Sequence, residues 1–150
     1  MRGDWGVFEG QVFDAYDPAV HVIPDLDGGS LKGRWIIEGW DFGRGERAET
    51  AVVWIAVDED WVEPIAVFHD AGFRNLYPAQ IAPKVKLIRS RYGIKEMTCV
   101  GDPAGAQRGA SGNYFEEYAK HGIFIGPCRV NHKNATRLED RDTPLANLLA

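Results

Sequence analysis

The sequence predicts an α/β fold in which helices flank a mixed β-sheet. Three apolar, strand-like segments come first, and a helix, a strand, a short helix and a short strand follow them. The 150 residues are the size of one ordinary domain. The composition, 45% hydrophobic and 11% aromatic, is typical of a globular protein. We therefore expect one folded core.

Residues 1–33 show no sustained period, and we interpret them as a lead-in segment that packs on the domain formed by residues 34–150. Within the lead-in, residues 7–13 predict a short strand. Residues 21–24 read as an extended piece that ends at a proline, and residues 27–30 as a loop.

The first three strands are expected at residues 34–41, 50–57 and 61–68. Alternation in the first strand places Ile36, Glu38 and Trp40 on one side of the sheet and Trp35, Ile37 and Gly39 on the other. The second strand is almost continuously apolar, which predicts burial on both faces. Residues 58–60 predict the hairpin turn that leads into the third strand.

Residues 78–92 give the clearest helix pattern, because Ile81, Val85, Ile88 and Tyr92 recur at helical spacing and Gly93 follows as a stop. Later elements are expected at residues 96–101 (strand), 114–121 (helix) and 123–127 (strand). Beyond residue 129 the pattern gives way to a polar segment, residues 131–142, and an apolar tail, residues 145–150.

A crossover helix that follows three hairpin-linked strands places the fourth strand parallel to the first. This order of elements is that of a ribonuclease-H-like domain. Asp41 and Asp102 would then end neighbouring parallel strands at one edge of the sheet, and ligands favour the carboxyl ends of such strands.

The paired aspartates predict a metal site. Two carboxylates on neighbouring strands repel each other unless a cation lies between them. Mg²⁺ and Mn²⁺ prefer such oxygen ligands, and two of these ions about 3.5–4 Å apart can hydrolyse a phosphodiester. We therefore predict that Asp41 and Asp102 are catalytic metal ligands. The alternative for each residue is a turn or cap role.

Other residues lie close to these aspartates in the sequence or in the expected fold. The flanking glycines (Gly39, Gly43, Gly101 and Gly105) would let a phosphate backbone approach closely. His69 and Asp70 follow the expected third strand and could flank the aspartates. Glu38 is left out because alternation places it on the opposite face from Asp41. Asp58 and Asp60 are expected to be solvated turn residues.

Candidate contacts to DNA phosphates come from a helix and a loop. Lys84, Lys86 and Arg89, with Arg91, lie off the apolar stripe of the predicted helix, and Arg108 lies in a glycine-rich loop. A plain solvated surface is the alternative for each. The net charge of −5 argues against a wholly basic DNA-wrapping surface, although bound cations can restore a positive field locally.

Several function classes are not supported. No apolar run approaches the roughly 20 residues that span a membrane, and residues 1–6 lack the apolar core of a signal peptide. The GxxxxGK[ST] phosphate loop is absent. Cys99 and Cys128 both lie in apolar, strand-like contexts, which predicts free thiols in a reducing compartment.

Five motifs together resemble the large subunits of tailed-phage terminases: residues 3–5 (GDW), 10–13 (GQVF), 21–23 (HVI), 39–43 (GWDFG) and 101–105 (GDPAG). The resemblance runs from the junction before the C-terminal nuclease domain to about residue 128. It implies a ribonuclease-H-like endonuclease that cuts concatemeric viral DNA with two Mg²⁺ or Mn²⁺ ions. It also implies the terminase small subunit, the portal and the ATPase motor as partners, in the cytoplasm of a bacterial host of a phage or prophage.

Within this resemblance, Asp41 matches the first-strand metal aspartate and Asp102 the carboxylate that ends the fourth strand. The family's ATPase motor and its third acidic residue, on a later helix, have no counterpart here, because Asp140 and Asp142 come too soon. A C-terminally truncated fragment with weak metal binding and little activity is therefore expected. The alternatives are a resolvase-like nuclease and an inactive remnant that binds DNA or a partner.

Overall fold

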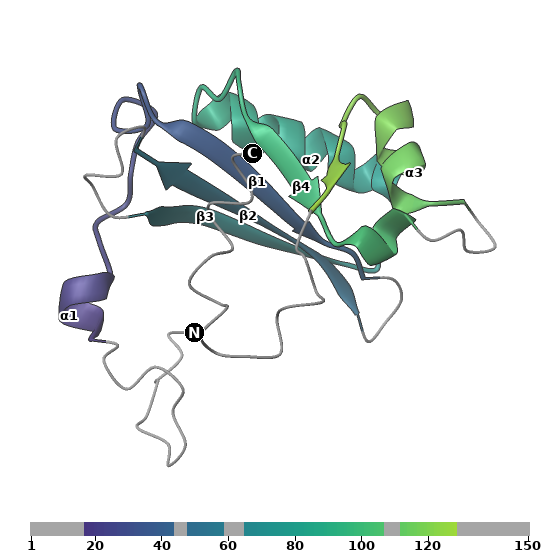
Figure 1. The fold of residues 1–150 in the computed structure, drawn as a ribbon, viewed down its shortest axis with the longest axis horizontal. Helices are drawn as coiled ribbons and strands as arrows, with labels where there is room; N and C mark the ends of the chain where they lie inside the picture. Colours follow the sequence, from purple (N-terminus) through teal and green to yellow (C-terminus); the bar gives the residue numbers. More distant parts are fainter. Residues whose placement is uncertain (1–16, 44–47, 59–64, 107–111, 129–150) are drawn as a thin grey trace, which may run out of the picture.

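A computed structural model describes residues 17–43, 48–58, 65–106 and 112–128 of the chain. Its elements follow the expected order (Figure 1). They are α1 (Pro18–His21), β1 (Trp35–Asp41), β2 (Glu49–Val57), β3 (Ala66–Arg74), α2 (Pro78–Arg91), β4 (Thr98–Gly101), the 3₁₀ helix η1 (Pro103–Ala106), α3 (Tyr114–Lys120) and β5 (Gly126–Pro127).

The five strands form one mixed sheet in the order β3-β2-β1-β4-β5. β2 is antiparallel to both β1 and β3, whereas β1 and β4 are parallel, as are β4 and β5. The crossover through α2 therefore makes β4 the parallel neighbour of β1, as the element order predicts.

Helix α2 begins and ends where the sequence predicts. Pro78 occupies the first turn, where its missing N–H costs nothing. The Tyr77 backbone N–H donates to Oε1 of Gln80 at 3.0 Å. At the other end Gly93 has φ of +67°, which glycine adopts without strain. Ile81 and Val85 are buried, so the helix docks through the predicted stripe.

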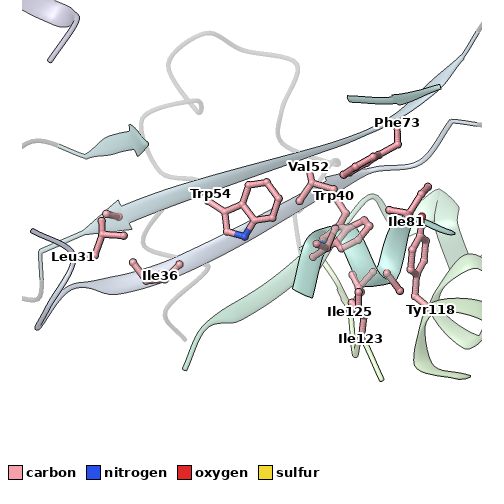
Figure 2. Close-up of a cluster of buried hydrophobic side chains, with 13 residues drawn as sticks. Leu31, Ile36, Trp40, Val52, Trp54, Phe73, Ile81, Tyr118, Ile123 and Ile125 are labelled. Atoms are coloured by element: carbon pink, nitrogen blue, oxygen red, sulfur yellow. The ribbon is translucent and has the colours of Figure 1, made fainter. Parts of the chain in front are cut away.

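The hydrophobic core lies between one face of the sheet and the helices (Figure 2). Trp54 spans the middle of the sheet, and Trp40 and Tyr118 close the end near α3. Leu31, from the segment before β1, also belongs to this cluster. The other buried members are Ile36, Val52, Ala56, Phe73, Ile81, Ala82, Val85, Ile123 and Ile125.

Two expectations about the strands are wrong. In β2, buried residues alternate with half-buried ones up to Ala56, so the strand is not buried equally on both faces. The reason is that the core cluster lies on one side of the sheet only. The third strand lies later than expected, at Ala66–Arg74, because it pairs along the whole of β2, from Ala56↔Ala66 to Glu49↔Arg74. Residues 61–64, the first half of the expected range, lie outside the described residues.

Among the helices that the structure describes, none combines the length and apolarity needed to cross a membrane. Cys99 and Cys128 are free thiols, as expected. The expected strand at residues 7–13 and the other motifs before Asp17 lie outside the described part of the chain. The boundary between lead-in and domain at residues 33 and 34 stays a prediction.

Candidate metal site

The parallel pairing of β1 with β4 brings Asp41 and Asp102 side by side. Trp40 of β1 pairs with Gly101 of β4, and this is the last pair of the two strands. The Asp102 backbone N–H then donates to the Trp40 carbonyl at 3.2 Å, which continues the register by one residue. Neighbouring strands lie about 4.8 Å apart. Both aspartates are exposed, so the backbone presents two carboxylates to solvent at one edge of the sheet.

Asp102 also has the turn role that the sequence offered as its alternative. Its Oδ1 accepts a hydrogen bond from the Ala104 backbone N–H at 2.8 Å, and its carbonyl accepts one from Gly105 at 2.8 Å. These bonds start η1 directly after the strand. The turn holds the carboxyl group in one orientation, and each of its oxygens still has a lone pair through which it could hold a cation.

The glycines beside the aspartates have a packing role that sequence reasoning missed. A Cβ on Gly105 would lie 2.5 Å from two carbons of the Phe42 ring, and a Cβ on Gly101 would lie 2.8 Å from that ring. A Cβ on Gly43 would collide with the Glu49 backbone. The expectation that these glycines make room for a phosphate is therefore wrong for Gly101 and Gly105, because the Phe42 side chain fills that room.

Phe42 anchors the end of β1 to the helical layer. Its ring stacks on Tyr114 of α3, with centroids 5.0 Å apart and an interplanar angle of 6°, and meets Phe115 edge-on at 5.6 Å. Trp40 packs on Tyr118 at 4.7 Å. Burial raises the pKa of Tyr118 to about 12, so its phenol stays neutral at physiological pH. Asp41 thus lies between two residues, Trp40 and Phe42, that α3 holds in place.

Behind the aspartates, Glu38 lies on the opposite face of the sheet, as predicted, but it is fully buried, with 0% exposure. Its two oxygens accept hydrogen bonds from Nε1 of Trp40 at 2.7 Å and Nε1 of Trp54 at 2.8 Å. Arg89 donates to the same carboxylate from Nε at 2.8 Å and from a terminal nitrogen at 2.6 Å. This ion pair ties β1 and β2 to α2.

The ion pair corrects the interpretation of Arg89 as a DNA contact. Its side chain is 15% exposed and its guanidinium binds Glu38, so it faces the core side of α2 rather than solvent. Burial by itself lowers the pKa of Arg89, but the hydrogen bonds and negative charge of Glu38 outweigh burial, and the net pKa is raised. An isolated glutamate within an apolar strand was the sequence signal that a buried cation must accompany it.

Cys99 of β4 completes this buried cluster. Its sulfur lies 3.6 Å from Oε1 of Glu38 and 3.4 Å from a terminal nitrogen of Arg89. Burial, reinforced by the negative charge of Glu38, raises the pKa of the Cys99 thiol to about 12. The thiol therefore remains protonated and unreactive near neutral pH.

The remaining candidates do not join the aspartates. Lys84 and Lys86 are exposed on α2. His69 and Asp70 lie within β3 rather than after it; His69 packs between Trp54 and Tyr92 at 5.4 Å from each ring. Asp70 pairs with Val53 of β2, which pairs with Gly39, so it is two strands away from Asp41. Arg108, Asp140 and Asp142 lie outside the described residues.

Asp41 and Asp102 supply the hard oxygen ligands that suit Mg²⁺ or Mn²⁺, so the donor chemistry fits such an ion. Across residues 17–43, 48–58, 65–106 and 112–128, however, no three His, Cys, Asp or Glu side chains gather in a way that could hold a metal. The described site is therefore a two-carboxylate site.

Two solved structures resemble this fold. The P22 large terminase nuclease domain is similar with a TM-score of 0.53 and 16% sequence identity, over 76% of this chain and 59% of that one. The large terminase nuclease from thermophilic phage G20c gives a TM-score of 0.43 and 20% identity, over 77% of this chain and 54% of that one. No protein-family model matches the sequence, and no curated protein matches it.

The likeness to the P22 domain shows that the mixed five-stranded sheet with its flanking helices has the ribonuclease-H-like fold of a terminase nuclease domain. At this level of identity it shows the fold alone. The chain spans little more than half the length of either solved structure.

Proposed function

We propose that this chain is nuclease-domain sequence of a viral DNA-packaging terminase, and that its parent protein hydrolyses phosphodiester bonds of double-stranded DNA. The observation that carries the proposal is the placement of Asp41 and Asp102 at the carboxyl ends of adjacent parallel strands in a fold shared with the P22 terminase nuclease domain. Ligands of open α/β sheets bind at such strand ends.

In this proposal Asp41 and Asp102 bind Mg²⁺ or Mn²⁺, in the two-ion arrangement that the terminase resemblance implies. The bound ions supply a nucleophilic water and stabilise the leaving oxygen. The β1–β4 register sets the spacing of the two carboxylates. The turn at Ala104 orients Asp102, and the packing of Phe42 on Tyr114 fixes the strand end that carries Asp41.

The proposed partners follow from the same family. Concatemeric double-stranded DNA is the substrate, and the terminase small subunit, the portal and the ATPase motor are the proteins with which the parent would act. The proposed location is the cytoplasm of a bacterium that carries the phage or prophage. None of these partners needs a membrane.

The first test is metal binding. We expect Mn²⁺ to bind the chain in titration calorimetry, and Asp41→Asn or Asp102→Asn to weaken binding at least about tenfold, because each removes one charged ligand. Asp58→Asn is the matched control, since Asp58 follows β2 at the far end of the sheet from Asp41. Equal binding by all three variants would contradict the assignment.

The second test is DNA cleavage. We expect Mn²⁺-dependent nicking of plasmid DNA that is largely independent of sequence, since the site offers metal-bound contacts to phosphate rather than groups that read bases. The isolated chain should cut weakly, because a loosely held metal pair costs rate steeply. Chelation and Asp41→Asn should each abolish nicking. Robust cutting that Asp41→Asn abolishes would place a third ligand in this chain, with Asp140 and Asp142 the next positions to replace.

A second candidate function is DNA or partner binding without cleavage. The observation that favours it is the two-carboxylate site, which lacks a third metal-binding side chain among the described residues. Absence of nicking with either Mg²⁺ or Mn²⁺, together with retained DNA binding, would support this alternative over the nuclease.

A third test concerns the lysines of α2, which we retain as proposed phosphate contacts. Lys84 and Lys86 are exposed, and Arg89 is not included because Glu38 binds it. The double variant Lys84→Glu/Lys86→Glu should reduce the slope of log affinity for duplex DNA against log salt by about two. Lys95→Glu, an exposed lysine just beyond the helix, is the control. An unchanged slope would remove α2 from the DNA path.

A further inference from the structure

A group of exposed apolar side chains lies at the β3 edge of the sheet, away from the aspartates. Val20 belongs to α1, and Val22 and Ile23 belong to the extended segment after it. Ile65 directly precedes β3, and Val67 is the second residue of that strand. Their side chains are 42–70% exposed. Together with Leu26, Arg34 and others they line a groove of about 770 Å³. We call this surface the β3 groove.

The strand beside the groove can accept a further strand. β3 is the last strand of the sheet order, and within the described residues it pairs only with β2. An edge strand presents backbone N–H and C=O groups on its outer side. Val67 therefore combines an exposed apolar side chain with a backbone edge that no strand of the described residues covers.

The β3 groove continues into a cleft of different chemistry. The cleft holds about 600 Å³ and shares Leu26 and Val67 with the groove. Three carboxylates line it, from Asp25, Asp27 and Asp70, beside the rings of Phe68, His69 and Tyr92. One cation also faces it, Arg91, whose guanidinium lies 5.7 Å from the centre of the Tyr92 ring. Acidic groups thus outnumber basic ones.

We propose that this edge binds an extended peptide segment of a partner protein. The peptide pairs with the outer side of β3 as an additional strand, places apolar side chains in the β3 groove, and directs a lysine or arginine into the carboxylate cleft. Backbone hydrogen bonds provide affinity in such strand addition, and the pockets for alternate side chains provide specificity. Carboxylates beside aromatic rings are the surroundings that a peptide cation favours.

Charge decides against two other occupants. A nucleic-acid backbone would bring phosphates against the three carboxylates. A second copy of the chain, paired through its own β3, would bring another Asp70 into the same acidic surroundings. A peptide that combines apolar and basic residues matches both the groove and the cleft.

The test uses a fluorescently labelled, end-blocked octapeptide in which valine alternates with threonine and which ends in two lysines. Its binding to the full chain is measured by fluorescence anisotropy. The matched probe replaces the lysines with glutamates. We expect saturable binding of the lysine peptide and binding of the glutamate peptide that is at least about tenfold weaker, because like charges oppose it.

Val67→Lys should weaken binding of the lysine peptide at least about tenfold, because it removes an apolar side chain that the bound peptide would cover. The double variant Asp25→Asn/Asp70→Asn should weaken binding of the lysine peptide. It should also reduce the difference in affinity between the lysine peptide and the glutamate peptide. Leu87→Lys is the control, because Leu87 is 71% exposed on α2 and lies outside the groove. Mn²⁺ binding should be unchanged in every variant, which separates this inference from the metal site.

The proposal is overturned if neither peptide saturates, if both bind equally, or if Leu87→Lys has the same effect as Val67→Lys. A concentration-dependent dimer in light scattering that Val67→Lys dissociates would also overturn it, because a second copy would then cover the groove.

Discussion

Glu38→Gln is expected to lower the free energy of unfolding by about 3–5 kcal/mol, because it removes the partner of a buried charge. Glutamine keeps one acceptor oxygen for the indole N–H groups of Trp40 and Trp54. It cannot balance the guanidinium of Arg89, which donates two hydrogen bonds to the carboxylate. Urea unfolding followed by tryptophan fluorescence measures the change, since both indoles report on this cluster.

Two variants accompany that measurement. Lys120→Met removes a surface ion pair between exposed Lys120 and half-buried Glu117, and should change stability by less than about 1 kcal/mol. The double variant Glu38→Gln/Arg89→Met removes both buried charges but keeps an acceptor for the indole N–H groups, and it should recover much of the loss because no unbalanced buried charge remains. A loss below about 1 kcal/mol for Glu38→Gln would contradict the buried ion pair.

Gly105→Ala is expected to lower the free energy of unfolding by about 1–3 kcal/mol, the usual cost of overfilling a packed site. The added methyl group would lie 2.5 Å from the Phe42 ring, so the ring must leave its stacked position on Tyr114. Because Phe42 directly follows Asp41, this movement should also weaken Mn²⁺ binding. Chemical denaturation and calorimetry on the same sample measure the two effects.

Gly126→Ala is the matched control for Gly105→Ala. A Cβ at Gly126 would meet the Cys99 carbonyl at 3.7 Å, an ordinary contact distance. This variant should leave both stability and metal binding nearly unchanged. Full Mn²⁺ affinity in destabilised Gly105→Ala would show that Phe42 supports the fold without positioning Asp41.

The order of the elements, the helix at Pro78–Arg91 and the parallel pairing of β1 with β4 could be predicted from the sequence. These features depend on local periodicity, on glycine and proline signals and on the handedness of crossovers, all of which act along the chain. The adjacency of Asp41 and Asp102 follows from the same topology. Metal binding by the two residues stays a prediction.

Only the tertiary structure decided how single side chains are used. Arg89 looks like a surface cation in the sequence, yet it is turned inward by Glu38, 51 positions away. In the sequence, Gly101 and Gly105 suggest space for a phosphate beside the backbone, yet the Phe42 ring occupies that space. The true range of β3 depended on its pairing with β2. Each of these outcomes arises from contacts between segments far apart in sequence, where burial, charge pairing and shape act only once the chain has folded.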